Sequence, residues 1–175
     1  SQKSPSLSRS LPDPDFRLQT DAGMFKHFLG YLPQQSEIQR DFPASVWEVA
    51  LSGNLGRVKN RLRVGFGYDS ASGERAQKAL TMLGMEDMKK RSYNELSGGQ
   101  QQRVGVARAL VVDPKIIFAD EPTGNLDTEN SELVFDLLHR LAHEEGYCVI
   151  VVTHDLAIAE KADEVLRLKD GCLIS

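Results

Sequence analysis

Apolar residues recur with strand and helix periods along most of the chain, but not in its first part. Residues 1–24 are rich in Ser and Pro and have no apolar period, so we expect a poorly ordered tail. The apolar run at 28–32 predicts a short strand that leads into Pro33 and Gln34. Further along, the spacing of apolar residues predicts helices at 44–51, 74–83 and 100–111.

From residue 113 onward, the pattern predicts strands that alternate with helices. Strands are expected at 115–119 and 147–153, helices at 128–143 and 156–162, and a closing pair of strands at 164–168 and 172–174. Such alternation is typical of an α/β domain with a parallel sheet and helices on both of its faces. The chain thus divides into the tail at 1–24, the end of a core strand and its loop at 25–43, an α-helical subdomain at 44–112 and the C-terminal part of the core at 113–175.

Composition limits the classes of function. The 175 residues suffice for one domain, and 41% of them are hydrophobic and 26% charged. The net charge of −4 gives no electrostatic reason to bind nucleic acid, and we expect no such partner. The chain has no run of 18 apolar residues, so we expect no membrane-spanning segment. Cys148 and Cys172 are the only cysteines, and we expect two reduced core thiols rather than a disulfide.

A serine and two glycines open the third expected helix. The backbone N–H groups at this helix start are not covered by large side chains; the residues are Ser97, Gly98, Gly99 and Gln100. The helix dipole adds partial positive charge at the same N-terminus. Such a helix start can hold a phosphate. The structural alternative is a serine N-cap followed by a glycine turn.

Polar residues also follow the expected core strands. Asp120 and Glu121 end one strand, where the first carboxylate can hold Mg²⁺ and the second can act as a general base. His154 follows the next strand and can donate a hydrogen bond to a phosphate oxygen. Gln34 follows the first strand and can reach a metal or its water. Taken singly, each could be an ordinary structural or surface residue.

Together, in this order and spacing, these residues resemble a known family. From about Phe28 to the C-terminus, the chain is similar to the nucleotide-binding subunits of ATP-binding cassette (ABC) transporters. Residues 96–100 match the ABC signature, 116–120 match Walker B and 125–127 match the D-loop. The Q-loop glutamine, the catalytic glutamate and the switch histidine of the family correspond to Gln34, Glu121 and His154.

The resemblance implies a fold, a reaction and partners. The fold would be an incomplete P-loop NTPase (RecA-like) core with an inserted α-helical signature subdomain. ATP and Mg²⁺ would be the cofactors, with Asp120 and Gln34 near the metal, Glu121 activating water and His154 at the γ-phosphate. The residues implied to contact nucleotide, besides Gln34, are Ser97, Gly98, Gly99, Gln100 and Asp127. The subunit would form a head-to-tail dimer with a second ABC ATPase subunit and bind integral membrane transporter subunits at the cytoplasmic face of the membrane.

One part of the family pattern is missing. A Walker A loop, G-x-x-x-x-G-K-[ST], should precede the Q-loop and hold the phosphates, yet none of the 14 glycines is followed by Lys. We therefore expect this chain alone to bind Mg-ATP weakly or not at all, while its signature and D-loop could complete an ATP site on an intact partner. The strands that accompany the loop would also be missing, which would expose sheet edges and apolar faces.

Two other classes remain as alternatives. A degenerate pseudo-ATPase would bind the membrane subunits without hydrolysing ATP. A structural chromosome-maintenance head also carries a signature and Walker B without Walker A, but its Q-loop lies on the other lobe. Here Gln34 precedes Ser97 on the same chain with no heptad repeat between them, which favours the transporter subunit.

Three further features carry less information. A basic cluster between residues 57 and 63 is expected to be a solvated surface, with a membrane-proximal contact as the alternative. His139 and His143 lie four residues apart on one helix, so zinc binding is conceivable, but they fall on its polar side and a solvated face is expected.

The transported cargo is indicated only by two resemblances. Residues 33–49 resemble zinc and manganese importers, and residues 121–127 resemble lipoprotein-release and macrolide exporters. Of these two we favour metal import.

Overall fold

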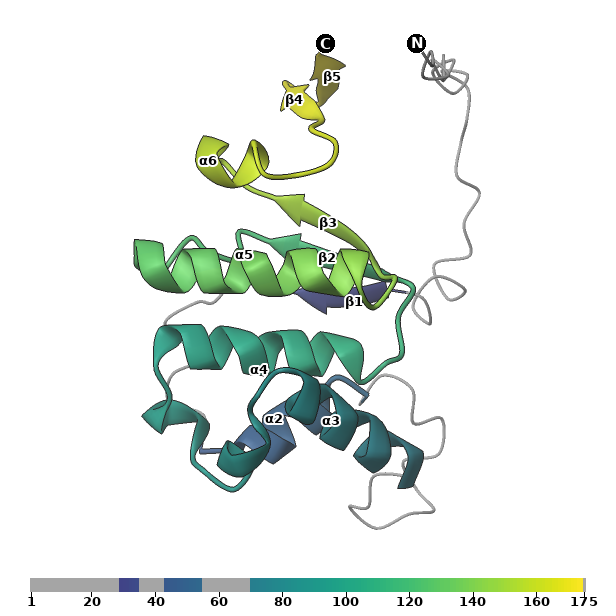
Figure 1. The fold of residues 1–175 in the computed structure, drawn as a ribbon, viewed down its shortest axis with the longest axis vertical. Coiled ribbons are helices and arrows are strands. Elements are labelled where there is room, and N and C mark those ends of the chain that lie inside the picture. The colour runs from purple at the N-terminus through teal and green to yellow at the C-terminus, as the bar shows by residue number, and fades with distance from the viewer. Residues whose placement is uncertain (1–28, 35–42, 55–69, 175) are drawn as a thin grey trace, which may run out of the picture.

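The computed structural model describes residues 29–34, 43–54 and 70–174 (Figure 1). The tail expected at 1–24 and the basic cluster between residues 57 and 63 therefore lie outside the described residues.

Three parallel strands form the central sheet. They are β1 (Leu29–Leu32), β2 (Ile116–Asp120) and β3 (Cys148–Val152), in the spatial order β1-β2-β3. In the register of the sheet, Leu32 lies beside Ala119, and Ala119 lies beside Val151. All three expected core strands are thus confirmed, each within two residues of its predicted ends.

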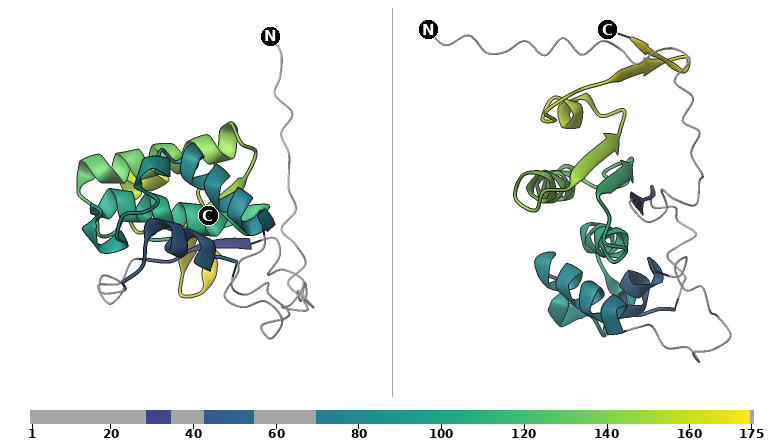
Figure 2. Two further views of the ribbon diagram at one scale, coloured as in Figure 1. Left: turned by 90° about the horizontal axis from the view of Figure 1, so that it is seen from below. Right: turned by 90° about the vertical axis from the view of Figure 1, so that its right-hand side faces the viewer.

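Two helices cover one face of this sheet. Helix α4 (Gly98–Leu110) packs on β1, α5 (Thr128–His143) packs on β3, and the two helices contact each other (Figures 1 and 2). Because side chains alternate along a strand, Leu32, Ile117 and Ala119 all point toward these helices and are buried. Strand β1 packs so closely on α4 that position 30 has no room for a side chain. A Cβ at Gly30 would lie only 2.6 Å from the carbonyl oxygen of Ala109.

The other face of the sheet is open among the described residues. Its side chains come from alternate positions of the three strands, and we call this set the open face: Leu29, Tyr31, Phe118, Cys148, Ile150 and Val152. Four of its apolar residues, two from β1 and two from β3, are between 42% and 49% exposed. The expected exposure of apolar faces is confirmed, whereas helices on both faces are not seen in the described part of the chain.

The open face corrects the prediction for the cysteines. Both Cys148 and Cys172 are free thiols, as expected, but both are exposed instead of lying in the core. Cys148 begins β3 with its side chain on the open side of the pleat, which an apolar run alone cannot reveal. Cys172 begins β5 (Cys172–Ile174), where every residue is exposed.

A helical cluster packs against the side of α4 away from the sheet. It comprises α2 (Val46–Ser52), α3 (Ser70–Met82) and the short 3₁₀ turns η2 (Glu86–Met88) and η3 (Tyr93–Glu95). A capping box between Ser45 and Glu48 starts α2. Helix α3 begins at Ser70, four residues before the prediction, because burial of Ala76, Ala79 and Leu80 outweighs the helix penalty of about 1 kcal/mol at Gly73.

The chain ends in a short helix and a hairpin. Helix α6 (Leu156–Ala159) is shorter than expected, and β4 (Arg167–Lys169) pairs antiparallel with β5 in a hairpin that extends beyond the sheet (Figure 1). Asp170 and Gly171 both have positive φ, as the tight turn of a two-residue hairpin requires. None of the helices in the described ranges is long and apolar enough to cross a membrane.

The two faces of the sheet predict unequal effects of the same substitution. Ile117→Ala empties a fully buried position and should reduce the free energy of unfolding by about 2–5 kcal/mol. Ile150→Ala, on the neighbouring strand and the open face, should cost less than about 1 kcal/mol. Urea unfolding followed by circular dichroism compares them, and equal losses would show that the open face is covered in solution.

Candidate functional site

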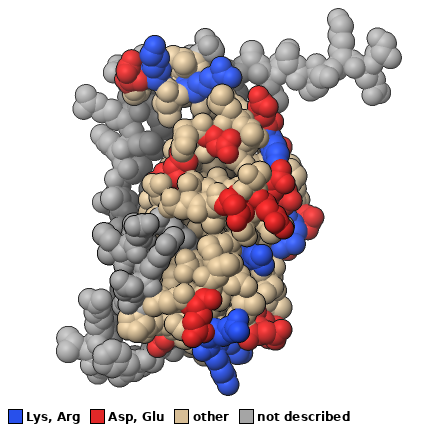
Figure 3. Space-filling model, turned by 90° about the vertical axis from the view of Figure 1, so that its left-hand side faces the viewer, with Lys and Arg blue, Asp and Glu red and all other residues tan. Residues whose placement is uncertain are grey.

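The parallel sheet brings the candidate residues to one edge. Since β1, β2 and β3 run in the same direction, the residues that follow them emerge at the same, carboxyl edge. Gln34 follows β1, Asp120 ends β2 with Glu121 directly after it, and His154 follows β3. Figure 3 looks onto the side toward which the strands of Figure 1 point, where acidic and basic groups are interspersed and no broad basic region gathers among the described residues.

Glu121 and His154 are in direct contact. Nδ1 of His154 lies 2.7 Å from Oε1 of Glu121, and the backbone N–H of His154 donates to the same oxygen at 3.0 Å. The hydroxyl of Thr153 donates to Oε2 of Glu121 at 3.3 Å. Both carboxylate oxygens of Glu121 are therefore held by residues that follow β3.

The backbone at Glu121 is unusual. Its φ of 44° lies in the left-handed region, which residues other than glycine seldom adopt and which costs on the order of 1–3 kcal/mol. The backbone N–H of Glu121 donates to the carbonyl of Val152 at 2.8 Å, so the turn is tied to the end of β3. The strained turn aims the carboxylate across the edge toward His154.

Asp120 faces the other way, toward β1. The hydroxyl of Tyr31 donates to Oδ2 of Asp120 at 3.3 Å. Loss of solvent around the ring, and then the charge of Asp120 and the hydrogen bond to it, raise the pKa of Tyr31. Tyr31 and Thr153 are site neighbours that sequence reasoning missed, because only the register of the sheet shows which residues face Asp120 and Glu121.

Gln34 lies beside the loop that follows Glu121. A Cβ at Gly124 would lie 3.6 Å from Nε2 of Gln34 and 3.5 Å from Cβ of Glu121. The amide of Gln34 and the carboxylate of Asp120 supply oxygen ligands of the kind that Mg²⁺ prefers. Among the described residues no cluster of three or more His, Cys, Asp or Glu could hold a metal, so these two would bind Mg²⁺ only together with water and phosphate oxygens.

The signature residues form a capped helix start. The hydroxyl of Ser97 accepts from the N–H of Gln100 at 3.3 Å, and Oε1 of Gln100 accepts from the N–H of Ser97 at 3.0 Å. The N-cap that the sequence offered as a structural alternative is therefore present. It does not exclude a phosphate, because Ser97 and Gly98 are exposed at the N-terminus of a helix of 13 residues.

The glycine pair also serves packing. A Cβ at Gly98 would lie 3.0 Å from Cδ2 of Leu126, and a Cβ at Gly99 would collide with the side-chain amide of Asn130. The start of α4 thus meets the loop before α5, where Asp127 caps α5 by accepting from the N–H of Asn130 at 2.8 Å. Hydrogen bonds from the backbone and then the side chain of Asn130 lower the pKa of Asp127.

The candidate residues therefore form two groups. One group lies at the carboxyl edge of the sheet, and we call it the catalytic group after the roles that the sequence predicts for its members: Gln34, Asp120, Glu121 and His154. The signature group consists of Ser97, Gly98, Gly99 and Gln100 together with Asp127 of the D-loop. The loop from 121 to 127 connects the two groups.

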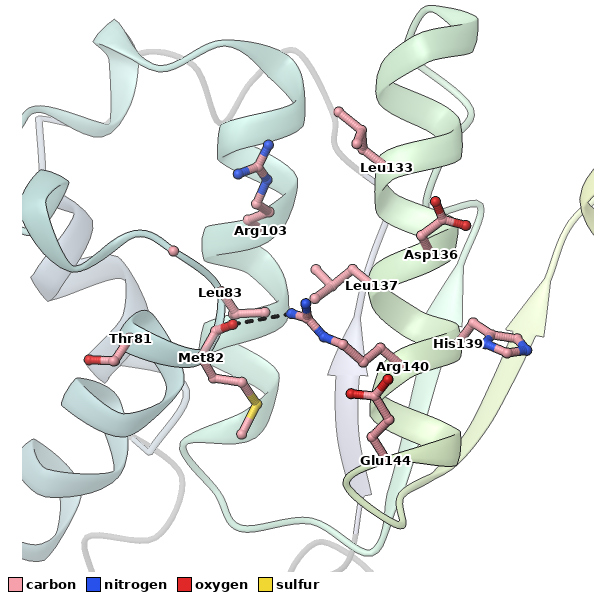
Figure 4. Close-up of a pocket in the computed structure, with 11 residues that line it drawn as sticks. Thr81, Met82, Leu83, Arg103, Leu133, Asp136, Leu137, His139, Arg140 and Glu144 are labelled. Carbon is pink, nitrogen blue, oxygen red and sulfur yellow. Dashed lines mark hydrogen bonds between the residues drawn. The ribbon is translucent and has the colours of Figure 1, made fainter.

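A groove of about 650 Å³ lies elsewhere, between α3, α4 and α5 (Figure 4). Its lining contains Arg103 and Arg140, and Arg140 donates to the carbonyl of Met82 at 3.2 Å. No residue of either candidate group lines this groove. It is therefore separate from the candidate site.

His139 and His143 lie on the exposed side of α5, as predicted. Their rings stack with centroids 4.1 Å apart, and Nε2 of His143 is 3.2 Å from a carboxylate oxygen of Asp163. His143 therefore connects α5 to the segment that follows α6.

Comparison with known proteins points to a single family. Residues 11–124 match the ABC transporter family profile. The chain is 49% identical over 106 residues to a macrolide export ATP-binding/permease protein, MacB, of a Shewanella species, covering 61% of this chain and 16% of that protein. It is 48% identical over 105 residues to the lipoprotein-releasing system ATP-binding protein LolD of Hyphomonas neptunium, covering 60% of this chain and 46% of that protein.

A solved structure agrees with these relatives. The dimeric bacterial ABC transporter cassette MJ0796 is 34% identical to the chain with a TM-score of 0.61, covering 87% of this chain and 64% of that one. In each of these comparisons the chain spans less than two thirds of its relative. Since the curated relatives are named for macrolide export and lipoprotein release, they give no support to the expected metal import.

The contact between Glu121 and His154 predicts a measurable shift. The hydrogen bond to Glu121, and then the negative charge of that carboxylate, raise the pKa of His154 above its ordinary value of 6.5. The folded chain therefore holds this proton more tightly than the unfolded chain does. The resulting stabilisation is fully present below the ordinary pKa and is lost as the pH rises through the raised pKa.

An NMR titration of the His154 ring tests this shift. The wild-type pKa should lie above the ordinary value, and Glu121→Gln should return it toward that value because the charge is removed. Glu144→Gln removes an exposed carboxylate at the C-terminal end of α5 and should leave the titration unchanged. A wild-type ring that titrates at its ordinary pKa would contradict the contact.

Proposed function

Because the chain belongs to the ABC transporter ATP-binding family, we propose that it is the part of an ATP-hydrolysing transporter subunit that supplies the signature half of a shared ATP site. The single observation that carries this proposal is the difference between the two candidate groups. The signature group is complete and positioned by its own caps, whereas the catalytic group has no phosphate-binding loop beside it in the 175 residues.

The signature group would act on a nucleotide held by another subunit. Ser97 and Gly98 present the positive end of α4, and Asp127 lies on the adjoining loop. In a head-to-tail dimer these groups would face the γ-phosphate bound to the phosphate loop of the partner. Phosphoryl transfer depends on positioning and on neutralising charge, and a capped helix start supplies both.

The catalytic group would serve the second site of the dimer. Asp120 and Gln34 would hold Mg²⁺, which neutralises charge on the phosphates. Glu121 would orient and deprotonate the attacking water, and His154 would donate a hydrogen bond to the γ-phosphate. In the present structure Glu121 and His154 satisfy each other, so hydrolysis would require a phosphate to draw His154 away from Glu121.

The relatives suggest the setting in which this ATPase would work. MacB is named as an ATP-binding/permease protein and LolD as part of a lipoprotein-releasing system. We infer that the chain acts at the cytoplasmic face of a membrane with integral membrane subunits. We also infer that it powers export or release of its cargo, which agrees with the resemblance of residues 121–127 to that group of transporters.

The missing phosphate loop predicts weak nucleotide binding. Isothermal titration of the chain alone with Mg-ATP should give no binding tighter than about 1 mM, since the groups that hold the β- and γ-phosphates are absent. A dissociation constant in the micromolar range would contradict this expectation and would require another cradle for the phosphates.

A complementation assay tests the signature half directly. The partner is an intact ABC cassette whose own signature serine is replaced by Arg, so that it keeps its phosphate loop but is inactive as a homodimer. Adding the chain should restore ATPase activity, because the signature group containing Ser97 then completes the site of the partner.

Two variants determine which group is used. Ser97→Arg should abolish the restored activity, because it places a bulky cation at the helix start. Glu121→Gln should leave the restored activity intact, because Glu121 belongs to the site that lacks a phosphate loop. Absence of any rescue would favour the alternative, a pseudo-ATPase that only binds membrane subunits.

A further inference from the structure

One side chain lies between the two parts of the signature group, the start of α4 and the loop before α5. It belongs to Asn130, which occupies the third position of α5. Its amide contacts Asp127 on one side and meets Gly99 on the other. The signature and D-loop motifs, residues 96–100 and 125–127, do not include Asn130.

Asn130 holds both carboxylate oxygens of Asp127. Its backbone N–H donates to Oδ1 at 2.8 Å, which is an ordinary N-cap contact. Its side-chain amide donates in addition to Oδ1 at 3.0 Å and to Oδ2 at 2.9 Å. A cap needs only the backbone contact, so the amide contacts do something further: they stop the carboxylate from rotating about its last bond.

The other end of the Asn130 amide is fixed by the glycine at position 99. A Cβ at Gly99 would collide with Oδ1 of Asn130 and would lie only 3.0 Å from its Cγ. Gly99 is buried, so the amide oxygen occupies the space that any other residue at position 99 would need. The amide is thus held from both sides, and the start of α4 and Asp127 have a fixed position relative to each other.

The orientation of Asp127 matters because of its charge. A carboxylate only accepts hydrogen bonds, and it repels a phosphate. Asp127 and Ser97 are both exposed, whereas Asn130 is half-buried between them. A freely rotating Asp127 could turn its charge toward a phosphate at the start of α4. Held by the amide, it presents its oxygens in one direction only, and Asn130 itself stays behind the exposed surface.

We propose that Asn130 is a positioning residue of the signature group. It holds the Asp127 carboxylate at a set place relative to Ser97, so that both residues meet a nucleotide on another subunit in one fixed arrangement. The effect of this arrangement on ATP hydrolysis rests on the proposed function. The coupling between Gly99 and Asp127 through Asn130 rests on the contacts alone.

NMR titration of the Asp127 carboxyl carbon measures the first contact. Hydrogen bonds from the backbone and then the side chain of Asn130 hold the pKa of Asp127 below its ordinary value of 3.8. Asn130→Ala removes the amide but keeps the backbone N–H, so the pKa of Asp127 should rise part of the way toward that value. The matched control is Ser131→Ala, since Ser131 contacts Asp127 through its backbone N–H, and this variant should leave the titration unchanged.

A substitution on α4 tests whether Asn130 transmits between the two parts. Gly99→Ala places a methyl group against the Asn130 amide and should displace the amide from Asp127, so the pKa of Asp127 should rise. In an Asn130→Ala background the same substitution should have no further effect, because the two sites are coupled only through that amide. An unchanged titration in Gly99→Ala, or an equal rise in both backgrounds, would overturn the coupling.

The complementation assay measures the role of Asn130 in hydrolysis. Asn130→Ala and Asn130→Asp should each lower the maximal restored ATPase rate about tenfold or more, because small misplacements of positioned groups are costly. The concentration of chain that gives half-maximal rescue should change little, since Asn130 is not part of the exposed surface. Circular dichroism checks that both variants are folded. Aspartate keeps the size of asparagine but cannot donate, so an undiminished rate in Asn130→Asp would show a packing role only and overturn the proposal.

The outcomes separate this inference from the proposed function. If the wild-type chain restores no activity, the proposed function fails, and the part of Asn130 in hydrolysis fails with it. The titrations still decide the coupling of Gly99 to Asp127 in that case. If the wild-type chain restores activity and both Asn130 variants restore it fully, the positioning role is overturned and the proposed function stands.

Discussion

The parallel pairing of β1, β2 and β3 is the constraint on which the rest of the site depends. Because the three strands run in one direction, residues far apart in sequence emerge at the same edge of the sheet. Gln34, Glu121 and His154 are separated by dozens of residues and still lie within one loop cluster. A shift of one residue in this pairing would move Asp120 to the helix-covered face and separate it from Tyr31.

The two candidate groups are held by different kinds of polar contact. The hydrogen bonds that hold the signature group are local, within the capping box of α4 and the Asp127 cap of α5. The catalytic group depends on contacts between strands, and Glu121 is kept in a strained conformation by residues that follow β3. The open face adjoins this second group, because Tyr31 of the open face donates a hydrogen bond to Asp120. One group is thus positioned mainly within short sequence segments, and the other depends on the pairing of the three strands.

Several features were predictable from the sequence for simple reasons. Helix α5 and strand β5 have the predicted bounds, and the other core strands deviate by at most two residues, because apolar periodicity and caps are local signals. The same holds for the exposed side of α5 that carries His139 and His143. The predictions failed where burial and tertiary contacts decide the outcome: α3 extends through Gly73, and Cys148 lies in an apolar strand but faces outward.

The sequence by itself determined which residues are candidates for the chemistry, since the signature, the paired carboxylates and the histidine are recognisable by type and spacing. It also determined that no Gly-Lys phosphate loop is present. Only the tertiary structure decided that Glu121 binds His154, that Tyr31 binds Asp120 and that, among the described residues, one face of the sheet is open. The physical reason is that motifs are local patterns of residue type, whereas contacts across a parallel sheet arise from register and twist, which no single segment of the chain encodes.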